Sequence, residues 1–170
     1  FSATIHGAND TELRLLTVEA SVPTEGAIAM ANYQAAPRLY RVKFLAQGQV
    51  AWGLRNYDAA PLIEECEISV TATGTSSTTA YGLVFRAYPT TSRRSSILRS
   101  KVSVSGPGQN YGVWLAEALH LTSIRDSRFD VIGGSGTYGL YATGVPDQWI
   151  GTETLTIRDT EVISTGGSTA

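Results

Sequence analysis

The sequence predicts an all-β protein, a right-handed parallel β-helix solenoid of about six coils with three short strands in each coil. Three observations support this prediction: a corner motif that recurs along the chain, a glycine-containing strand motif that recurs between the corners, and the composition. Of the 170 residues, 42% are hydrophobic and only 16% are charged. That hydrophobic share is enough for a continuous core, and the low charge with abundant Gly, Ser and Thr favours short strands and turns over long solvated helices.

The corner motif is clearest at residues 155–162, where apolar or small side chains stand at positions 157, 160 and 162. The alternation of a strand is therefore interrupted once, between Ile157 and Thr160, which indicates a bend between two short strands. Six copies cover nearly the whole chain, and their bends are expected at Thr17, Arg41, Glu65, Arg99, Asp126 and Asp159.

Equivalent residues of successive coils in a parallel solenoid lie about 4.8 Å apart and form columns. We expect two columns to be fully buried, namely Leu15, Leu39, Ile63, Ile97, Ile124 and Ile157, and Ala20, Phe44, Ile68, Val102, Phe129 and Val162. A third column follows the bend, where the interior narrows, and holds small side chains at Val18, Val42, Cys66, Ser100, Ser127 and Thr160. The single cysteine, Cys66, is therefore interpreted as a buried small hydrophobe and not as a nucleophile.

A fourth column points outward and is charged: Glu19, Lys43, Glu67, Lys101, Arg128 and Glu161. Its sign alternates over the first four members, so we interpret it as a solvated structural feature that helps to fix the strand register. Two further polar residues, Asn32 and Asn56, are expected to point inward and to satisfy backbone groups of the turns by stacked hydrogen bonding.

The glycine-containing strand motif appears at residues 52–54, 81–83, 111–113 and 138–140, each time as an aromatic residue, Gly, and Leu or Val. A degenerate first copy stands at residues 28–30. The unequal spacing of a constant motif indicates that one loop in each coil varies in length while the strands do not. The aromatic residues before the glycines are interpreted as a stacked packing column.

The repeats resemble the pectate-lyase-like family of right-handed parallel β-helices, over roughly residues 11 to 165. An antiparallel sandwich would not repeat one motif in one order at every turn, and the Leu/Asn ladder of a leucine-rich repeat is absent. The resemblance implies a fold but no single activity, because the family includes lyases, hydrolases, epimerases, phage tailspikes and surface proteins. We expect residues 1–170 to form a single domain, a segment of a longer chain.

The outward positions of the glycine-containing strands form the face whose residue types are least easily explained by the needs of folding. Arginine and aromatic side chains there could stack on sugar rings and hydrogen-bond their hydroxyls. Equally, a loop or a neighbouring subunit could cover them. The predicted ligand-binding residues are Arg55, Tyr57, Arg86, Trp114 and Tyr141.

Catalytic residues are less evident. The resemblance implies acidic calcium ligands and a groove base for a lyase, or several close aspartates for a hydrolase, and the sequence contains neither set. The nearest acidic pair is Asp126 and Asp159, at equivalent bends of adjacent coils, where like charges could support acid/base chemistry. Arg125 and Arg158 stand beside them, so charge compensation is the alternative interpretation.

For metals, cofactors, nucleic acid and membranes, the sequence gives negative predictions. No metal or cofactor site is predicted. The net charge of −2 disfavours nucleic acid as a partner. No apolar run approaches the roughly 20 residues needed for membrane insertion.

Two hypotheses of function follow. The first is a non-enzymatic scaffold or stalk of an extracellular, cell-surface or virion protein, whose candidate partners are a polysaccharide and further copies of the chain, joined end to end or as a trimer. The second is a polysaccharide-acting lyase or hydrolase, or a tailspike-type depolymerase, and it rests on fold analogy.

Overall fold

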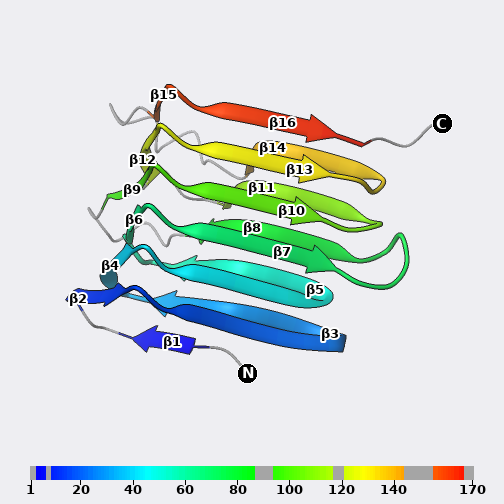
Figure 1. Ribbon diagram of the computed structural model, residues 1–170, viewed down its shortest axis with the longest axis horizontal. Helices are drawn as coiled ribbons and strands as arrows, with labels where there is room; N and C mark the ends of the chain where they lie inside the picture. Colours follow the sequence, from blue (N-terminus) through cyan, green and yellow to red (C-terminus); the bar gives the residue numbers. More distant parts are fainter. Residues whose placement is uncertain (1–2, 7–8, 87–93, 117–120, 144–154, 167–170) are drawn as a thin grey trace.

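The computed structural model describes residues 3–6, 9–86, 94–116, 121–143 and 155–166. They form a parallel β-solenoid without helices, so the predicted fold class is confirmed (Figure 1). Every strand pair in the two sheets is parallel, as coils of one hand require. The solenoid has about four turns, slightly fewer than the six coils expected.

The smaller sheet contains one strand from each copy of the corner motif. Its six strands, in spatial order, are β15 (Thr156–Arg158), β12 (Leu121–Arg125), β9 (Ser95–Leu98), β6 (Leu62–Glu64), β4 (Ala36–Tyr40) and β2 (Asn9–Arg14).

The larger sheet has ten strands and folds around the other two sides of the solenoid. Its first arm contains β7 (Glu67–Ala72), β10 (Lys101–Ser105), β13 (Arg128–Ile132) and β16 (Glu161–Thr165). Its second arm contains β1 (Ala3–His6), β8 (Thr79–Arg86), β11 (Gln109–Ala116) and β14 (Gly136–Thr143). Two long strands, β3 (Thr17–Tyr33) and β5 (Lys43–Tyr57), run through both arms, so the expected three short strands merge into two in these coils.

The bends of the motif are single residues in the left-handed region of the backbone. Arg41, Glu65 and Arg99 have φ of 53°, 52° and 46°. This turn points one backbone N–H to the coil above and the N–H two residues later to the coil below. Arg41 N donates to Glu64 O at 3.0 Å, and Lys43 N donates to Leu16 O at 2.9 Å. The bend therefore costs conformational energy but leaves the backbone paired on both sides.

The first coil is displaced by two residues from its predicted alignment. Leu13, and not Leu15, pairs with Leu39, and Val18 pairs with Phe44. The bend falls on Leu15, with φ of 54°, so the prediction of Thr17 at the bend is wrong and Leu15 is 69% exposed instead of buried. In consequence Leu16 replaces Val18 in the small column, and Thr17 replaces Glu19 in the charged column.

The predicted buried columns are confirmed through the middle of the solenoid. Leu39, Ile63, Ile97 and Ile124 are at most 2% exposed, as are Phe44, Ile68, Val102 and Phe129. The last members are not buried: Ile157 is 47% and Val162 is 49% exposed. The prediction fails there because no described coil covers this end of the solenoid.

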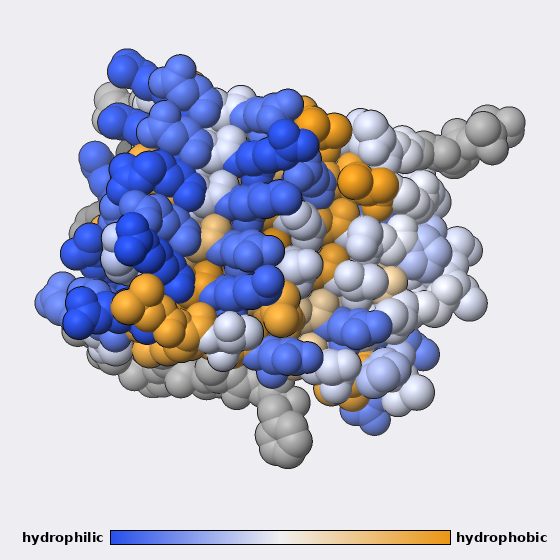
Figure 2. Space-filling model, viewed as in Figure 1, coloured by the Kyte–Doolittle hydropathy of each residue, from blue (hydrophilic) through white to orange (hydrophobic). Residues whose placement is uncertain are grey.

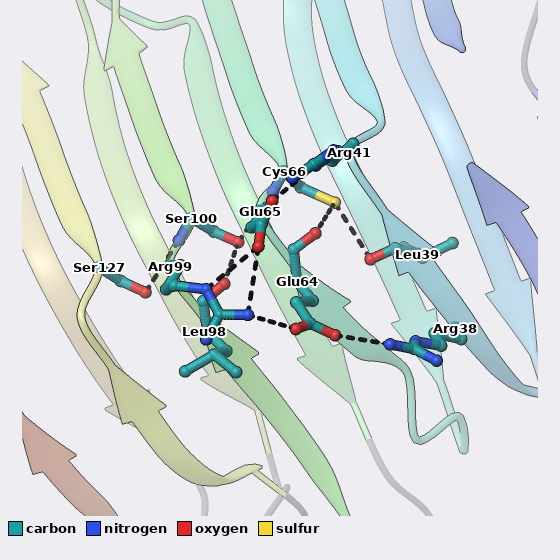
Figure 3. A network of polar contacts seen from close by, with 10 residues as sticks. All are labelled: Arg38, Leu39, Arg41, Glu64, Glu65, Cys66, Leu98, Arg99, Ser100 and Ser127. Atoms are coloured by element: carbon teal, nitrogen blue, oxygen red, sulfur yellow. Dashed lines mark hydrogen bonds and ion pairs between the residues drawn. The ribbon is translucent and has the colours of Figure 1, made fainter. Parts of the chain in front are cut away.

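The small column after the bend is also a hydrogen-bond ladder (Figure 3). Cys66 N donates to Ser100 Oγ at 3.1 Å, and Ser100 N donates to Ser127 Oγ at 3.2 Å. Each hydroxyl in turn donates to the carbonyl two residues earlier, at 2.9 Å for Ser100 and 2.7 Å for Ser127. The Cys66 thiol is buried, which raises its pKa, so it remains protonated and bonds to backbone carbonyls.

Charged side chains pair between coils on the outside of the solenoid, where Figure 2 shows hydrophilic residues gathered in columns. Arg41 Nε lies 2.6 Å from Glu65 Oε2, and Arg128 Nη1 lies 2.7 Å from Glu161 Oε2. The predicted column also places Lys101 beside Arg128, two like charges, and Asp130 contacts both. These exposed pairs fix register more than they add stability.

We expect stability to fall in acid through two of these carboxylates. A hydrogen bond from Arg41 lowers the pKa of Glu65 below its usual 4.5, and one from Arg128 lowers the pKa of Asp130 below its usual 3.8. A depressed folded-state pKa gives stability that is present above the unfolded-state value and is lost as pH falls through the folded-state value. In urea unfolding from pH 6 to pH 2, the variant Glu65→Gln with Asp130→Asn should therefore show a smaller loss of stability than the parent.

The matched control for this acid effect is Glu25→Gln, which neutralises an exposed carboxylate outside these ion pairs. It should retain the full pH dependence of the parent. An unchanged pH dependence in the double variant would contradict the prediction.

Candidate functional site

The outward side chains of the second arm form three columns in register across β5, β8, β11 and β14. The first column contains the aromatic residues before the glycines. The second and third columns contain the predicted ligand-binding residues together with smaller side chains. The columns are Trp52, Tyr81, Tyr111 and Tyr138; Arg55, Val84, Trp114 and Tyr141; and Tyr57, Arg86, Ala116 and Thr143.

A groove of about 350 Å³ lies over these columns. The hollow arises where short side chains follow long ones. In the second column Val84 lies between the larger Arg55 and Trp114, and in the third column Ala116 follows Arg86. The groove crosses four neighbouring strands and therefore follows the stack of coils. Its lining residues are Trp52, Arg55, Tyr57, Tyr81, Val84, Arg86, Trp114, Ala116 and Thr143.

The aromatic column is a continuous stack, as predicted. Ring centroids are 5.9 Å apart for Trp52 and Tyr81, 5.1 Å for Tyr81 and Tyr111, and 5.0 Å for Tyr111 and Tyr138, with interplanar angles of 8°, 9° and 12°. Rings stacked at the spacing of the coils cover one another's faces. Trp52 and Tyr81 also line the groove, so the column has a second role that its interpretation as packing alone missed.

Trp114 joins two of the columns. Its ring lies 5.1 Å from that of Tyr81 at 19°, and 6.0 Å from that of Tyr111 at 28°. Its Nε1 donates a hydrogen bond of 3.1 Å to Thr143 Oγ1. Both ends of the indole are therefore held, and the ring is fixed in the groove before any ligand arrives.

Arg55 is positioned by aromatic neighbours. Its guanidinium lies 4.6 Å from the ring centroid of Tyr57 and 5.4 Å from that of Trp52, and Nη2 donates to the Tyr57 hydroxyl. The Tyr57 ring is stacked in parallel on Tyr33 at 5.2 Å. A cation held over two rings retains unused N–H donors in a fixed orientation.

The groove is positively charged, although the chain has a net charge of −2. Arg55 and the exposed Arg86 both line it, and no described lining residue is an aspartate or glutamate. Burial raises the pKa of Tyr81, so its hydroxyl stays neutral near pH 7 and can both donate and accept a hydrogen bond. The arrangement suits a ligand rich in hydroxyl or anionic oxygen atoms.

The structure brings four of the five predicted ligand-binding residues to the groove: Arg55, Tyr57, Arg86 and Trp114. The fifth, Tyr141, is not among the lining residues. Its ring packs at a tilt against Tyr111 and Tyr138, at 5.3 and 5.0 Å. Sequence reasoning did not select the other five lining residues. Two of these are aromatic, Trp52 and Tyr81, and they were detectable from their outward positions on the same strands.

The acidic pair lies elsewhere. Asp126 and Asp159 are exposed at their bends, with φ of 49° and 47°, and neither lines the groove. Asp126 N donates to Arg158 O at 3.1 Å. Aspartate tolerates the left-handed region better than most residues, so the backbone accounts for both residues at this position.

Comparison with protein-family models, curated proteins and solved structures finds no significant match. The parallel β-solenoid is therefore shown by the structure, whereas membership of the pectate-lyase-like superfamily is not. Within the described ranges, no cluster of three His, Cys, Asp or Glu residues could hold a metal ion. In the same residues, no helix is long and apolar enough to cross a membrane.

Proposed function

We propose that the chain is a non-enzymatic scaffold or stalk that binds a polysaccharide in the groove of the second arm, as part of an extracellular, cell-surface or virion protein. The observation that carries this proposal is the groove itself, which is lined by four aromatic rings and two arginines. Its volume falls at the lower end of the range for ligand sites, about 300–1,000 Å³.

The chemistry of the lining residues supports a sugar ligand. Aromatic rings pack against the apolar faces of sugars, and guanidinium groups donate paired hydrogen bonds to hydroxyl or carboxylate oxygens. Trp114 and Arg55 are already held by Thr143 and Tyr57, so little side-chain entropy is lost on binding. Because the groove follows the stack of coils, an extended chain fits it better than a compact molecule.

An enzyme that cleaves polysaccharides, a lyase, a hydrolase or a tailspike-type depolymerase, is the alternative. It rests on the resemblance to pectate-lyase-like β-helices, which is an analogy of fold. The two proposals differ in their products, because only the enzyme releases shorter oligosaccharides.

The first test is binding of the purified chain to an array of polysaccharides, followed by titration calorimetry with the tightest binder. We expect Trp114→Ala combined with Arg86→Ala to weaken binding by about tenfold or more, because tryptophan and arginine are enriched among the few contact residues whose truncation costs about 2 kcal/mol or more. The matched control is Tyr40→Ala with Lys43→Ala, which removes an aromatic ring and a cation outside the second arm.

Unchanged binding in the groove variant, or weakening by the control to the same extent, would place the ligand elsewhere. Incubation of each bound polysaccharide with the parent chain, followed by chromatography of the products, addresses the alternative. Newly formed oligosaccharides would overturn the non-enzymatic proposal and establish the enzyme.

A further inference from the structure

The groove of the second arm has its charges in one part only. On β5 and β8 it is lined by Arg55 and Arg86, which lie in adjacent coils, two positions apart along their strands. On β11 and β14 its described lining residues are Trp114, Ala116 and Thr143, none of which is charged. We call these parts the arginine half and the neutral half. Because neighbouring strands lie about 4.8 Å apart, the centres of the two halves are about 10 Å apart.

The two arginines of the groove differ from arginines on the other sides of the solenoid. Four of those form ion pairs with carboxylates of neighbouring coils, namely Arg38, Arg41, Arg99 and Arg128. Among the described residues, no ion pair includes Arg55 or Arg86. A cleft lined by charges of one sign concentrates ligands of the opposite sign. An anionic ligand would also break no existing ion pair when it binds here.

The arginine half suits an anionic oxygen in its hydrogen-bond donors as well. Arg55 uses Nη2 to donate to the Tyr57 hydroxyl, and its remaining N–H groups are held in place by the rings on which the guanidinium packs. Arg86 is exposed at the groove. The short side chain of Val84 adjoins both arginines, next to Arg55 in its column and two positions before Arg86 on β8. It leaves room for a carboxylate or sulfate group, whose hydrogen bonds with guanidinium are about twice as strong as those of uncharged partners.

The neutral half offers no cation to such a group among its described lining residues. Trp114 already uses its only donor, Nε1, in the hydrogen bond of 3.1 Å to Thr143 Oγ1, and Ala116 has no polar side-chain atom. The face of the indole ring suits the apolar face of an uncharged sugar. A carboxylate placed here would lose hydration without gaining an ion pair, which is unfavourable.

We propose that the ligand of this groove is an acidic heteropolysaccharide, in which a sugar with a carboxylate or sulfate group lies over the arginine half and an uncharged sugar lies over the neutral half. The inference rests on the proposed binding of a polysaccharide and adds the chemistry and the register of the ligand. A polymer with a charge on every sugar, or on none, matches only one half of the groove.

The first test is an array that contains three classes of polysaccharide. In hyaluronan and chondroitin a uronic acid alternates with an uncharged amino sugar, polygalacturonate and alginate contain uronic acids throughout, and dextran and galactomannan are uncharged. We expect the tightest binder to belong to the first class. A tightest binder from either of the other classes would overturn the inference but not the proposed function. Absence of binding to every polymer would contradict the proposed function itself, and the inference with it.

The second test removes the charge from the tightest binder. Its carboxylates are reduced to alcohols, and in a separate sample any sulfate groups are removed. Loss of the anion that the arginines bind should weaken binding by about tenfold or more, because a hydrogen bond to a charged group contributes at least that factor. The two treatments thereby identify the anion. Equal binding of all forms would overturn the inference, while the binding of a polysaccharide would stand.

Variants of the groove then locate the two sugars. Arg55→Gln with Arg86→Gln should weaken binding of the acidic polymer by about tenfold or more and leave binding of its uncharged form almost unchanged, because only the charged partner is lost. Trp114→Ala should weaken binding of both forms by the same factor. Because Arg55 also packs on aromatic rings, Arg86→Gln alone, at an exposed position, repeats the test with a smaller effect and little risk to the fold.

The matched control is Arg125→Gln with Arg158→Gln. These exposed arginines are paired in register across β12 and β15 of the smaller sheet, so the variant removes the same charge from adjacent coils outside the groove. It should bind both forms as the parent does, and circular dichroism checks that every variant is folded. The inference is contradicted if the folded groove variant still prefers the acidic form as strongly as the parent, or if the control loses that preference.

Discussion

Replacement of Gly82 by alanine is expected to lower the free energy of unfolding by about 3 kcal/mol or more, the cost of overpacking that the backbone cannot relieve. A Cβ atom there would lie 2.4 Å from Val102 Cγ1 and 2.6 Å from the carbonyl oxygen of Gly112. The carbonyl belongs to the next strand of the second arm, so it cannot retreat without separating β8 from β11. Urea unfolding followed by circular dichroism measures the loss.

The control for this substitution is Gly136→Ala. The nearest atoms to a Cβ at this position belong to the ring of Tyr138, the closest at 3.2 Å, and that side chain is 38% exposed and can move. We expect a change within about 1 kcal/mol, as for other substitutions with room to relax. Equal losses for the two variants would show that close backbone approach is not the reason for the glycine at position 82.

The recurrence of this glycine was visible in the sequence, but its cause was not. A motif repeated once per coil indicates which residues lie at equivalent positions, and the register of β5, β8, β11 and β14 confirms that alignment. The room at each glycine is limited by a side chain of the first arm across the core. Ile68 lies opposite Gly53, and Val102 lies opposite Gly82. Such a relation joins residues of different motifs, so it becomes visible only in the three-dimensional structure.

The error in the first coil has a related origin. A shift by one residue would exchange inward and outward side chains, but a shift by two preserves the alternation. Leu13 and Leu15 are both leucines, so the pattern fits either alignment. In the structure the bend lies at Leu15, which fixes the alignment of this coil. An exposed leucine therefore occupies a left-handed position, and the sequence has no polar residue there that would indicate a bend.

The sequence was sufficient to predict which residues of the candidate site share a column, but not the groove that these columns form. The sequence placed Arg55, Trp114 and Arg86 on one outward face, and the structure places all three at one groove. The hollow itself follows from the short side chains of Val84 and Ala116 between longer ones, which is a property of neighbouring coils together. The orientation of Trp114 across the aromatic column follows from its bond to Thr143, 29 residues away.

Replacement of Asn56 by leucine is expected to destabilise the protein by about 2 to 4 kcal/mol, although leucine is more hydrophobic and the position is buried. Asn32 Nδ2 donates to Asn56 Oδ1 at 2.7 Å, and Asn56 Nδ2 donates to Val84 O at 3.1 Å. Both asparagines are at most 1% exposed. Leucine would leave the Asn32 donor without its acceptor in the core, where water cannot replace it.

The same column accepts apolar residues in later coils, at Phe85 and Leu115, so shape alone does not require asparagine. The double variant Asn32→Leu with Asn56→Leu should therefore be less destabilised than the sum of the two single variants, by about 1 to 2 kcal/mol, because no side-chain amide remains in the core without its partner. Urea unfolding of the four proteins completes the cycle. Additive losses would mean that the two amides act independently, and that what each contributes is its fit to the narrow interior and not the hydrogen bond between coils.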